Sequence, residues 1–132
     1  MLRAGKVRGF TLIEMMVVVS LILILTAISV PKYQQSVLRA KEAALRSNLF
    51  TLRTSIRAFT FEERHAPQSL DELVSAGYLG EVPVDPMTGS RTTWVIVEED
   101  VMQSADPNSP GILDVHSGSE AAALDGTTYS SW

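Results

Sequence analysis

The chain has 132 residues, a net charge of −4 at neutral pH and no cysteine. This length allows one small domain, and the lack of cysteine excludes a disulfide framework, a thiolate metal site and a cysteine nucleophile. From His65 to Trp132 a single basic residue, Arg91, stands against eleven acids, so this part lacks the basic face that nucleic-acid binding requires and we expect no nucleic-acid partner.

Residues 1–9 form a short basic segment at the start of the chain. Arg3, Lys6 and Arg8 are its only charged side chains. This composition is typical of a segment that stays on the cytoplasmic side of a membrane. A peptidase that cut after Gly9 would leave Phe10 with a free, positively charged amine.

Residues 10–30 are an apolar run that contains one ionisable group, Glu14. As a helix the run would be about 31 Å long, enough to cross a membrane. A carboxylate inside such a helix costs about 2.5–3.5 kcal/mol near mid-bilayer and less near the interface, so Glu14 calls for a partner. The amine of a processed Phe10, from the same or a neighbouring subunit, would supply one. A secretory signal, a simple membrane anchor and a buried core helix are the alternatives. The first leaves the length of the run unexplained and the second leaves Glu14 unexplained, whereas a core helix would need more apolar sequence around it than a chain of this size supplies.

A second, amphipathic helix segment is predicted between Pro31 and about Glu63. Pro31 removes one backbone donor, so we expect it to kink or loosen the helix there. Apolar residues then recur at helical spacing on one face: Leu38, Leu45, Leu49, Leu52, Ile56 and Phe59. The segment is also basic, with seven basic and three acidic residues between Lys32 and Arg64. The pattern supports an architecture in which this stem helix anchors a globular head, but it does not indicate a function.

The rest of the chain predicts a small α+β head. Ser69 as a cap and Glu72 three residues later predict a short helix over residues 69–76. Residues 83–89 are rich in turn formers, and the segments 92–97 and 111–116 carry the β-branched and apolar residues of strands. Two or three antiparallel strands would be marginal alone, so we expect the stem helix to form the second layer.

The hexapeptide Gly9-Phe10-Thr11-Leu12-Ile13-Glu14, after a basic leader and before a long apolar run, resembles the class III signal of type IV pilins and type II secretion pseudopilins. The resemblance implies a pilin-like α+β fold, in which a long N-terminal helix with a transmembrane half and an amphipathic half packs on a small antiparallel sheet with a C-terminal loop. It also implies that prepilin peptidase cleaves between Gly9 and Phe10, that Phe10 is N-methylated, and that Glu14 guides assembly.

Three regions follow from the resemblance: a cleaved leader (1–9), a transmembrane assembly helix (10–30), and a stem helix with a periplasmic head (31–132). Basic residues flank the apolar run on both sides, so charge alone leaves its orientation undecided. The resemblance favours an inner-membrane protein that crosses once, with a cytoplasmic N-terminus, and that joins a periplasmic filament when assembled.

The favoured function is a structural subunit of a type II secretion pseudopilus that drives protein export. The resemblance implies as partners further copies of the chain, minor pseudopilins, prepilin peptidase, an inner-membrane assembly platform and the membrane itself. Tyr78-Leu79 leading into the turn at residues 83–86, together with the absence of cysteine, is similar to major pseudopilins. A major or minor pilin of a type IV pilus is the alternative, followed by a membrane-anchored module that binds a ligand.

The C-terminal stretch carries a candidate calcium site, because major pseudopilins commonly fold this region around calcium and end near a tryptophan, here Trp132. Calcium takes six to eight oxygen ligands. Carboxylates of Glu120 and Asp125, with oxygens around Ser117 and Thr127, are the candidates. The alternative is a hydrogen-bonded loop without metal, held by Trp132.

The sequence contains little that supports catalysis, and we expect no enzymatic activity. The two histidines, His65 and His116, lie far apart and outside any nucleophile, metalloprotease or phosphate-loop motif. The acidic pairs at residues 62–63 and 98–99 are adjacent in sequence and so would not share one face of a strand.

Overall fold

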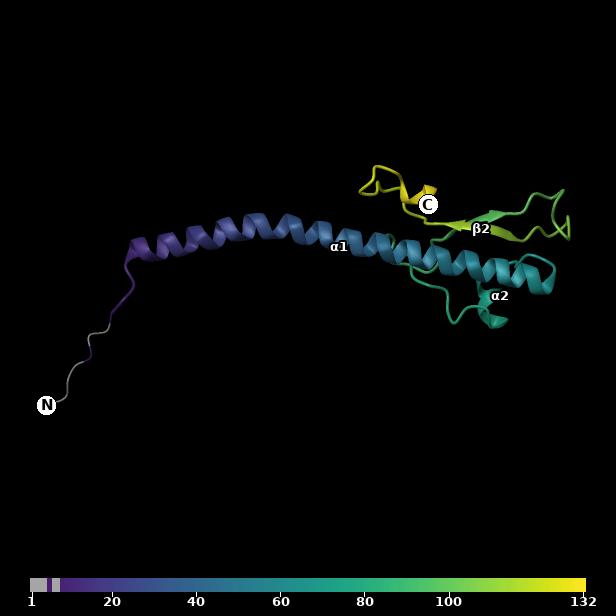
Figure 1. Cartoon of the computed structure of the whole chain (residues 1–132), viewed down its shortest axis with the longest axis horizontal. Coiled ribbons are helices and arrows are strands. Elements are labelled where there is room, and N and C mark those ends of the chain that lie inside the picture. The colour runs from purple at the N-terminus through teal and green to yellow at the C-terminus, as the bar shows by residue number, and fades with distance from the viewer. Residues whose placement is uncertain (1–4, 6–7) are drawn as a thin grey trace. The chain divides into compact units, whose positions relative to one another are not determined.

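The computed structural model describes residue 5 and residues 8–132. The expected leader lies partly outside the described residues, since its basic residues Arg3 and Lys6 are not among them. The described chain divides into two compact units, Met1–Val37 and Leu38–Trp132. Helix α1 (Leu12–Glu63) contributes to both units, and its labelled ribbon can be followed in Figure 1.

Helix α1 begins where Thr11 accepts a hydrogen bond from the main-chain N–H of Glu14 through its hydroxyl, at 3.2 Å. A threonine followed three residues later by glutamate is a sequence typical of helix starts, and an acid in the first turn interacts favourably with the helix dipole. The helix then runs through Pro31 without interruption. A kink or loosening at Pro31 stays a prediction. Serine and threonine hydroxyls on either side of it donate to carbonyls one turn earlier, as Thr26 and Ser36 do.

The first unit is an apolar helix without cover. Every residue from 8 to 37 is exposed, including the large apolar side chains of the run. Within the described residues α1 is the one helix long and apolar enough to cross a membrane.

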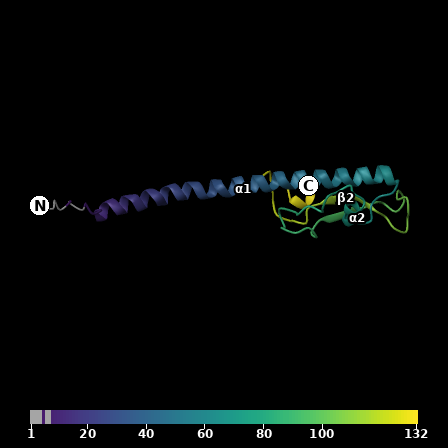
Figure 2. The ribbon, with the colours of Figure 1, turned by 90° about the horizontal axis from the view of Figure 1, so that it is seen from below.

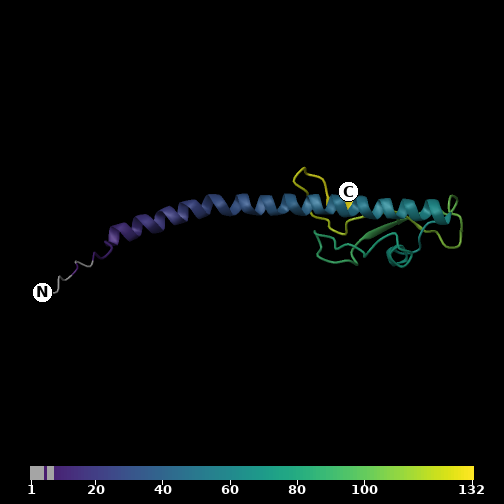
Figure 3. The ribbon, with the colours of Figure 1, turned by 60° about the horizontal axis from the view of Figure 1, so that its bottom comes forward.

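The second unit is built along the C-terminal half of α1. Helix α2 (Leu70–Ser75), strands β1 (Val95–Glu98) and β2 (Ile112–His116) and the 3-10 turn η1 (Tyr129–Ser131) gather beside this half of the helix in all three views (Figures 1, 2 and 3). The predicted stripe of α1 supplies five of the twelve buried core residues: all of its members from Leu45 to Phe59 are buried, and Leu38 is half-buried. The opposite layer contributes the buried residues Leu73, Leu79, Trp94, Ile112, Val115, Ala123 and Tyr129.

Helix α2 confirms the predicted capping pattern. The Ser69 hydroxyl accepts from the N–H of Glu72 at 3.2 Å, and the Glu72 carboxylate reaches back to the N–H of Gln68 at 2.6 Å. Gly77, at φ +84°, ends the turn in a conformation that glycine adopts without steric cost.

Strands β1 and β2 form a two-stranded antiparallel sheet in which Ile96 pairs with Val115, with an irregularity after Val97. Strand β2 has the expected mixture of buried and exposed positions, but all four residues of β1 are exposed. The expectation that both strands bury an apolar face against the stem is therefore wrong for β1, because its contribution to the core comes from the preceding residue, Trp94. The strand also starts three residues later than predicted, since Thr92 and Thr93 make hydroxyl hydrogen bonds to Ser90 instead of pairing in the sheet.

Candidate functional site

The predicted processing site lies directly before α1. Gly9 and Phe10 are exposed and outside the helix, and an added side-chain carbon at Gly9 would meet nothing within 4 Å. The peptide bond between them therefore lies in an accessible segment directly before the first turn of the helix. Glu14 sits in that first turn, on the exposed apolar helix.

Glu14 has a local role that the sequence reasoning missed. Its N–H is capped by Thr11, so it occupies the third helical position, where glutamate is common for reasons unrelated to assembly. The Thr-x-x-Glu spacing was the signal for this role. The cap uses the main-chain N–H of residue 14, so a side-chain substitution at Glu14 keeps the cap and removes the carboxylate.

The four candidate calcium ligands occupy two separate places. Asp125 and Thr127 are together, because the Asp125 carboxylate accepts from the Thr127 hydroxyl at 2.6 Å and from its N–H at 3.0 Å. These bonds outweigh slight burial and lower the pKa of Asp125, and Arg46 adds to the lowering. Glu120 accepts a long hydrogen bond from Ser130, at 3.4 Å.

Ser117 belongs to a different cluster, centred on Asp85. Both residues are fully buried, and the Ser117 hydroxyl donates to Asp85 Oδ2 at 2.6 Å. Asp85 also accepts from the N–H groups of Met87 and Gly118. This buried carboxylate joins the turn at residues 83–89 to the end of β2, and its position between two prolines was the only sequence signal for it.

Two residues of α1, Glu42 and Arg46, hold the C-terminal loop. Glu42 Oε1 accepts from the N–H of Leu124 and from the hydroxyl of Tyr129, both at 2.8 Å. Burial, followed by this bond to a carboxylate, raises the pKa of Tyr129 to about 12. The Arg46 guanidinium lies 4.2 Å from the ring centre of Trp132 and 3.7 Å from Asp125.

A third α1 residue, Arg53, ties the same loop to β2. It donates to Asp114 Oδ1 at 2.7 Å and to the main-chain oxygens of Val115 and Trp132. Burial would raise the pKa of Asp114, but the N–H of Val115 and the Arg53 guanidinium outweigh it and lower that pKa overall. Trp132 is fixed in turn, since its indole N–H donates to the Thr127 hydroxyl at 2.7 Å.

This arrangement does not fit calcium. The loop's carboxylates already accept hydrogen bonds from protein donors or face arginine, and Ser117 points to Asp85 instead of toward Asp125. Across residue 5 and residues 8–132, no three acidic or histidine side chains gather closely enough to hold a metal. Calcium binding itself stays a prediction, and the hydrogen-bonded loop is the arrangement that these contacts describe.

The histidines occupy unrelated positions. His65 is exposed at the end of α1, with its ring against Phe59, and His116 lies on β2 beside Asp114. The two histidines therefore do not share one site.

Comparison with known proteins identifies the family. A family model described as the prokaryotic N-terminal methylation motif matches residues 5–30, the stretch that contains Phe10 and Glu14. The type II secretion system core protein G of Escherichia coli (strain K12) is 30% identical over 97 residues, which cover 61% of this chain and 67% of that protein. The chain belongs to the type IV pilin-like family. Its α+β architecture, a long N-terminal helix with a small antiparallel sheet, confirms the fold expected for this family.

Two other curated relatives of this pilin-like protein are pilins. The type IV major fimbrial protein FimA of Dichelobacter nodosus is 34% identical over 73 residues, covering 55% of this chain and 46% of FimA, so the chain spans less than half of that relative. The type IV major alpha-pilin of Moraxella bovis is 28% identical over 114 residues, covering 86% of this chain and 70% of that pilin. No solved structure matches the chain.

Proposed function

We propose that this pilin-like protein is a structural subunit of a type II secretion pseudopilus, in which copies of the chain assemble through α1. The observation that carries the proposal is the exposed apolar helix from residue 12 to residue 30 with Glu14 in its first turn. Such a surface needs lipid or other apolar helices around it. A subunit that leaves the membrane for a bundle of identical helices exchanges one apolar environment for another.

The proposal assigns roles to the residues at the start of α1. Prepilin peptidase cleaves between Gly9 and Phe10, and Phe10 is then N-methylated. The cationic amine of Phe10 in one subunit pairs with Glu14 of a neighbour when the helices bundle. This pairing satisfies a carboxylate that would otherwise cost free energy in an apolar environment.

The remaining assignments follow the same scheme. The subunit crosses the inner membrane once, with its head in the periplasm, and works with minor pseudopilins and an assembly platform rather than as an enzyme. The relationship to the type II secretion core protein G and the small cysteine-free head support the secretion assignment. A pilin of a type IV pilus is the second candidate, favoured by the matches to FimA and to the Moraxella pilin.

The mass of the mature protein, purified from the cells that make it, tests the processing step. We expect a chain that begins at Phe10 and carries the mass of one additional methyl group. A chain that still contains its leader, in cells with the peptidase, would refute the proposal and favour a membrane-anchored binding module.

Substitutions at the start of α1 test the assembly step. Glu14→Gln and Glu14→Leu should still insert in the membrane, since each removes a charge from an apolar helix, but should not form filaments. The matched control is Thr11→Val, which removes the capping hydroxyl and keeps the carboxylate. Normal filaments from Glu14→Gln would refute the ion pair.

A deletion strain separates the two filament types. Loss of this subunit should abolish export of the secretion substrates while leaving surface pili intact. The opposite result would assign the chain to a type IV pilus.

A further inference from the structure

The exposed side of α1 in the second unit carries a groove with basic walls. It has a volume of about 500 Å³ and is lined by Arg46, Leu49, Phe50, Arg53, Arg57 and Trp132. The apolar floor and the three guanidinium groups together suit a ligand that is both acidic and apolar. We refer to this feature as the basic groove.

Parts of the basic groove have no partner within one copy. Phe50 is 73% exposed, although a phenylalanine gains free energy when it is buried. Arg57 is exposed, and it forms no ion pair with any side chain in the described part of the chain. Arg46 and Arg53 hold the C-terminal loop and so present a preorganised wall.

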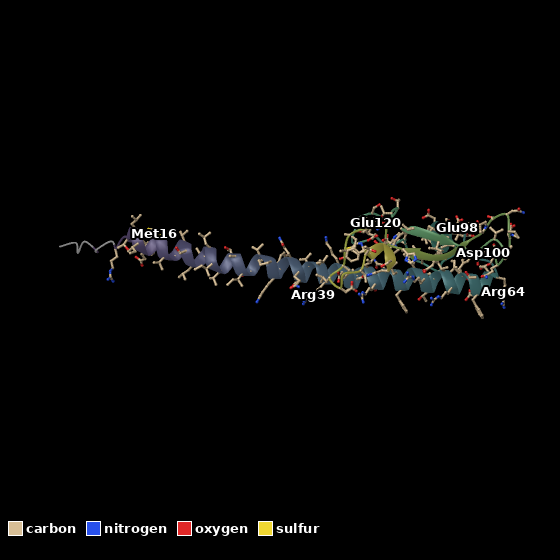
Figure 4. The ribbon with its side chains drawn as sticks, turned by 90° about the horizontal axis from the view of Figure 1, so that it is seen from above. Met16, Arg39, Arg64, Glu98, Asp100 and Glu120 are labelled. Carbon is tan, nitrogen blue, oxygen red and sulfur yellow. The ribbon has the colours of Figure 1, made fainter. Side chains whose placement is uncertain are left out.

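A segment of complementary chemistry begins at the last residue of strand β1. Glu98, Glu99 and Asp100 are consecutive acids, and Val101 and Met102 come directly after them. Met102 is 95% exposed and Val101 is 53% exposed. Figure 4 shows Glu98 and Asp100 on the side of the sheet, beside the C-terminal end of α1, and Arg64 directly after the last residue of that helix. We call residues 98–102 the acidic tip.

We propose that the acidic tip of one copy docks in the basic groove of a second copy. The inference rests on the proposed function, because a filament is what brings copies together in this orientation. The acids of the tip meet Arg57, which has no ion pair among the described side chains, beside the already paired Arg46 and Arg53, and the exposed Val101 and Met102 meet Phe50 and the apolar floor. The pairing also relieves the mutual repulsion of heads that each carry eleven acids against Arg91 after residue 64.

The tip of the same copy is not the occupant. Glu99 lines a neighbouring hollow of about 290 Å³ together with Arg57 and Phe61, but no ion pair joins Glu99 to Arg57 there. The groove next to Trp132 is lined by α1 and Trp132, without any residue of the tip.

Cysteine crosslinking tests the docking directly, because the chain has no native cysteine. Thr54→Cys places a thiol on the groove wall and Met102→Cys places one on the tip. The two variants are made as separate chains of different size in the same cells, with the assembly machinery present, and filaments are oxidised after isolation. A heterodimer can then form only between copies. The matched control pairs Met102→Cys with Ser47→Cys, an exposed position of α1 outside the groove.

Charge reversal supplies the second measurement. Arg57→Glu should reduce the heterodimer yield by about tenfold, the effect of losing about 1.4 kcal/mol of favourable charge pairing. Combining it with Glu98→Lys and Glu99→Lys on the other chain should restore the yield. The control is Lys41→Glu, the same change of charge on an exposed residue of α1 away from the groove.

Each outcome decides the matter. A groove-to-tip heterodimer that responds to charge reversal and rescue supports the docking. Filaments of normal abundance with no groove-to-tip heterodimer, or with equal yields from the control pair, overturn the docking while the proposed function stands. Failure of the parent chain to form filaments overturns the proposed function, and the docking with it.

Discussion

Removal of the Glu42 carboxylate is the sharpest test of how the C-terminal loop is held. Glu42 Oε1 accepts from the N–H of Leu124 and from the hydroxyl of Tyr129, which is 1% exposed. Each hydrogen bond to a charged group contributes about 1.5–3 kcal/mol, and loss of the acceptor leaves the buried phenol without its partner. Since Glu42 itself is half-buried, we take the lower end of this range, about 1.5 kcal/mol, for each of the two hydrogen bonds. We therefore expect Glu42→Ala to lose about 3 kcal/mol of unfolding free energy.

The assay is thermal unfolding of the full chain in detergent, followed by near-ultraviolet circular dichroism. A loss of 3 kcal/mol in a domain of this size lowers the melting temperature by roughly 10 °C or more. The matched control is Glu62→Ala, which removes a carboxylate that accepts from the hydroxyl of Tyr78 at 2.6 Å on the surface. We expect the control to change the unfolding free energy by about 0.5 kcal/mol or less. A Glu42→Ala variant as stable as the control would refute the reasoning.

Three further predictions concern the same head. The melting temperature separates the two alternatives for the C-terminal loop: it should rise by several degrees in millimolar calcium if the loop binds the metal, and stay unchanged if the loop is held by hydrogen bonds alone. Gly118→Ala should destabilise the head strongly, because the added carbon would lie 2.1 Å from the carbonyl oxygen of Thr93, whereas Gly80→Ala, with nothing within 4 Å, should fold as the parent does. The pKa of Asp114 is lowered from 3.8 in the folded state. Its contribution to stability is therefore full above pH 3.8 and is lost as the pH falls through the lowered pKa. We expect Asp114→Asn to reduce this loss of stability at acidic pH, measured as the melting temperature against pH. An unchanged acid profile in that variant would count against the role of its pairing with Arg53.

Local patterns in the sequence predicted most of the secondary structure. The spacing of Leu45, Leu49, Leu52 and Ile56 predicted the buried face of α1, because burial of a helix follows its 3.6-residue period. Ser69 and Glu72 predicted the start of α2, since a cap is satisfied by groups three residues away. The hexapeptide from Gly9 to Glu14 predicted the family in the same way, because the pattern consists of particular residue types at fixed spacings of a few residues.

The burial expected for β1 was wrong because the tertiary structure, and not the strand's own sequence, decides which residues are covered. A residue's propensity describes its neighbours in the chain, whereas the surrounding structure decides which face of a strand is covered. Strand β1 stays exposed because Trp94 fills the adjacent core space.

The sequence by itself determined the apolar helix, its acid at residue 14 and the stripe that anchors the head, all of which depend on spacings of a few residues. Only the tertiary structure decided how the C-terminal loop is held, since Glu42 meets Tyr129 across 87 residues and Arg53 meets Trp132 across 79. It also decided that Ser117 serves the buried Asp85, 32 residues away, and not the loop in which the sequence placed it. Hydrogen bonds of this kind follow from which segments the topology brings together, and no local pattern records that choice.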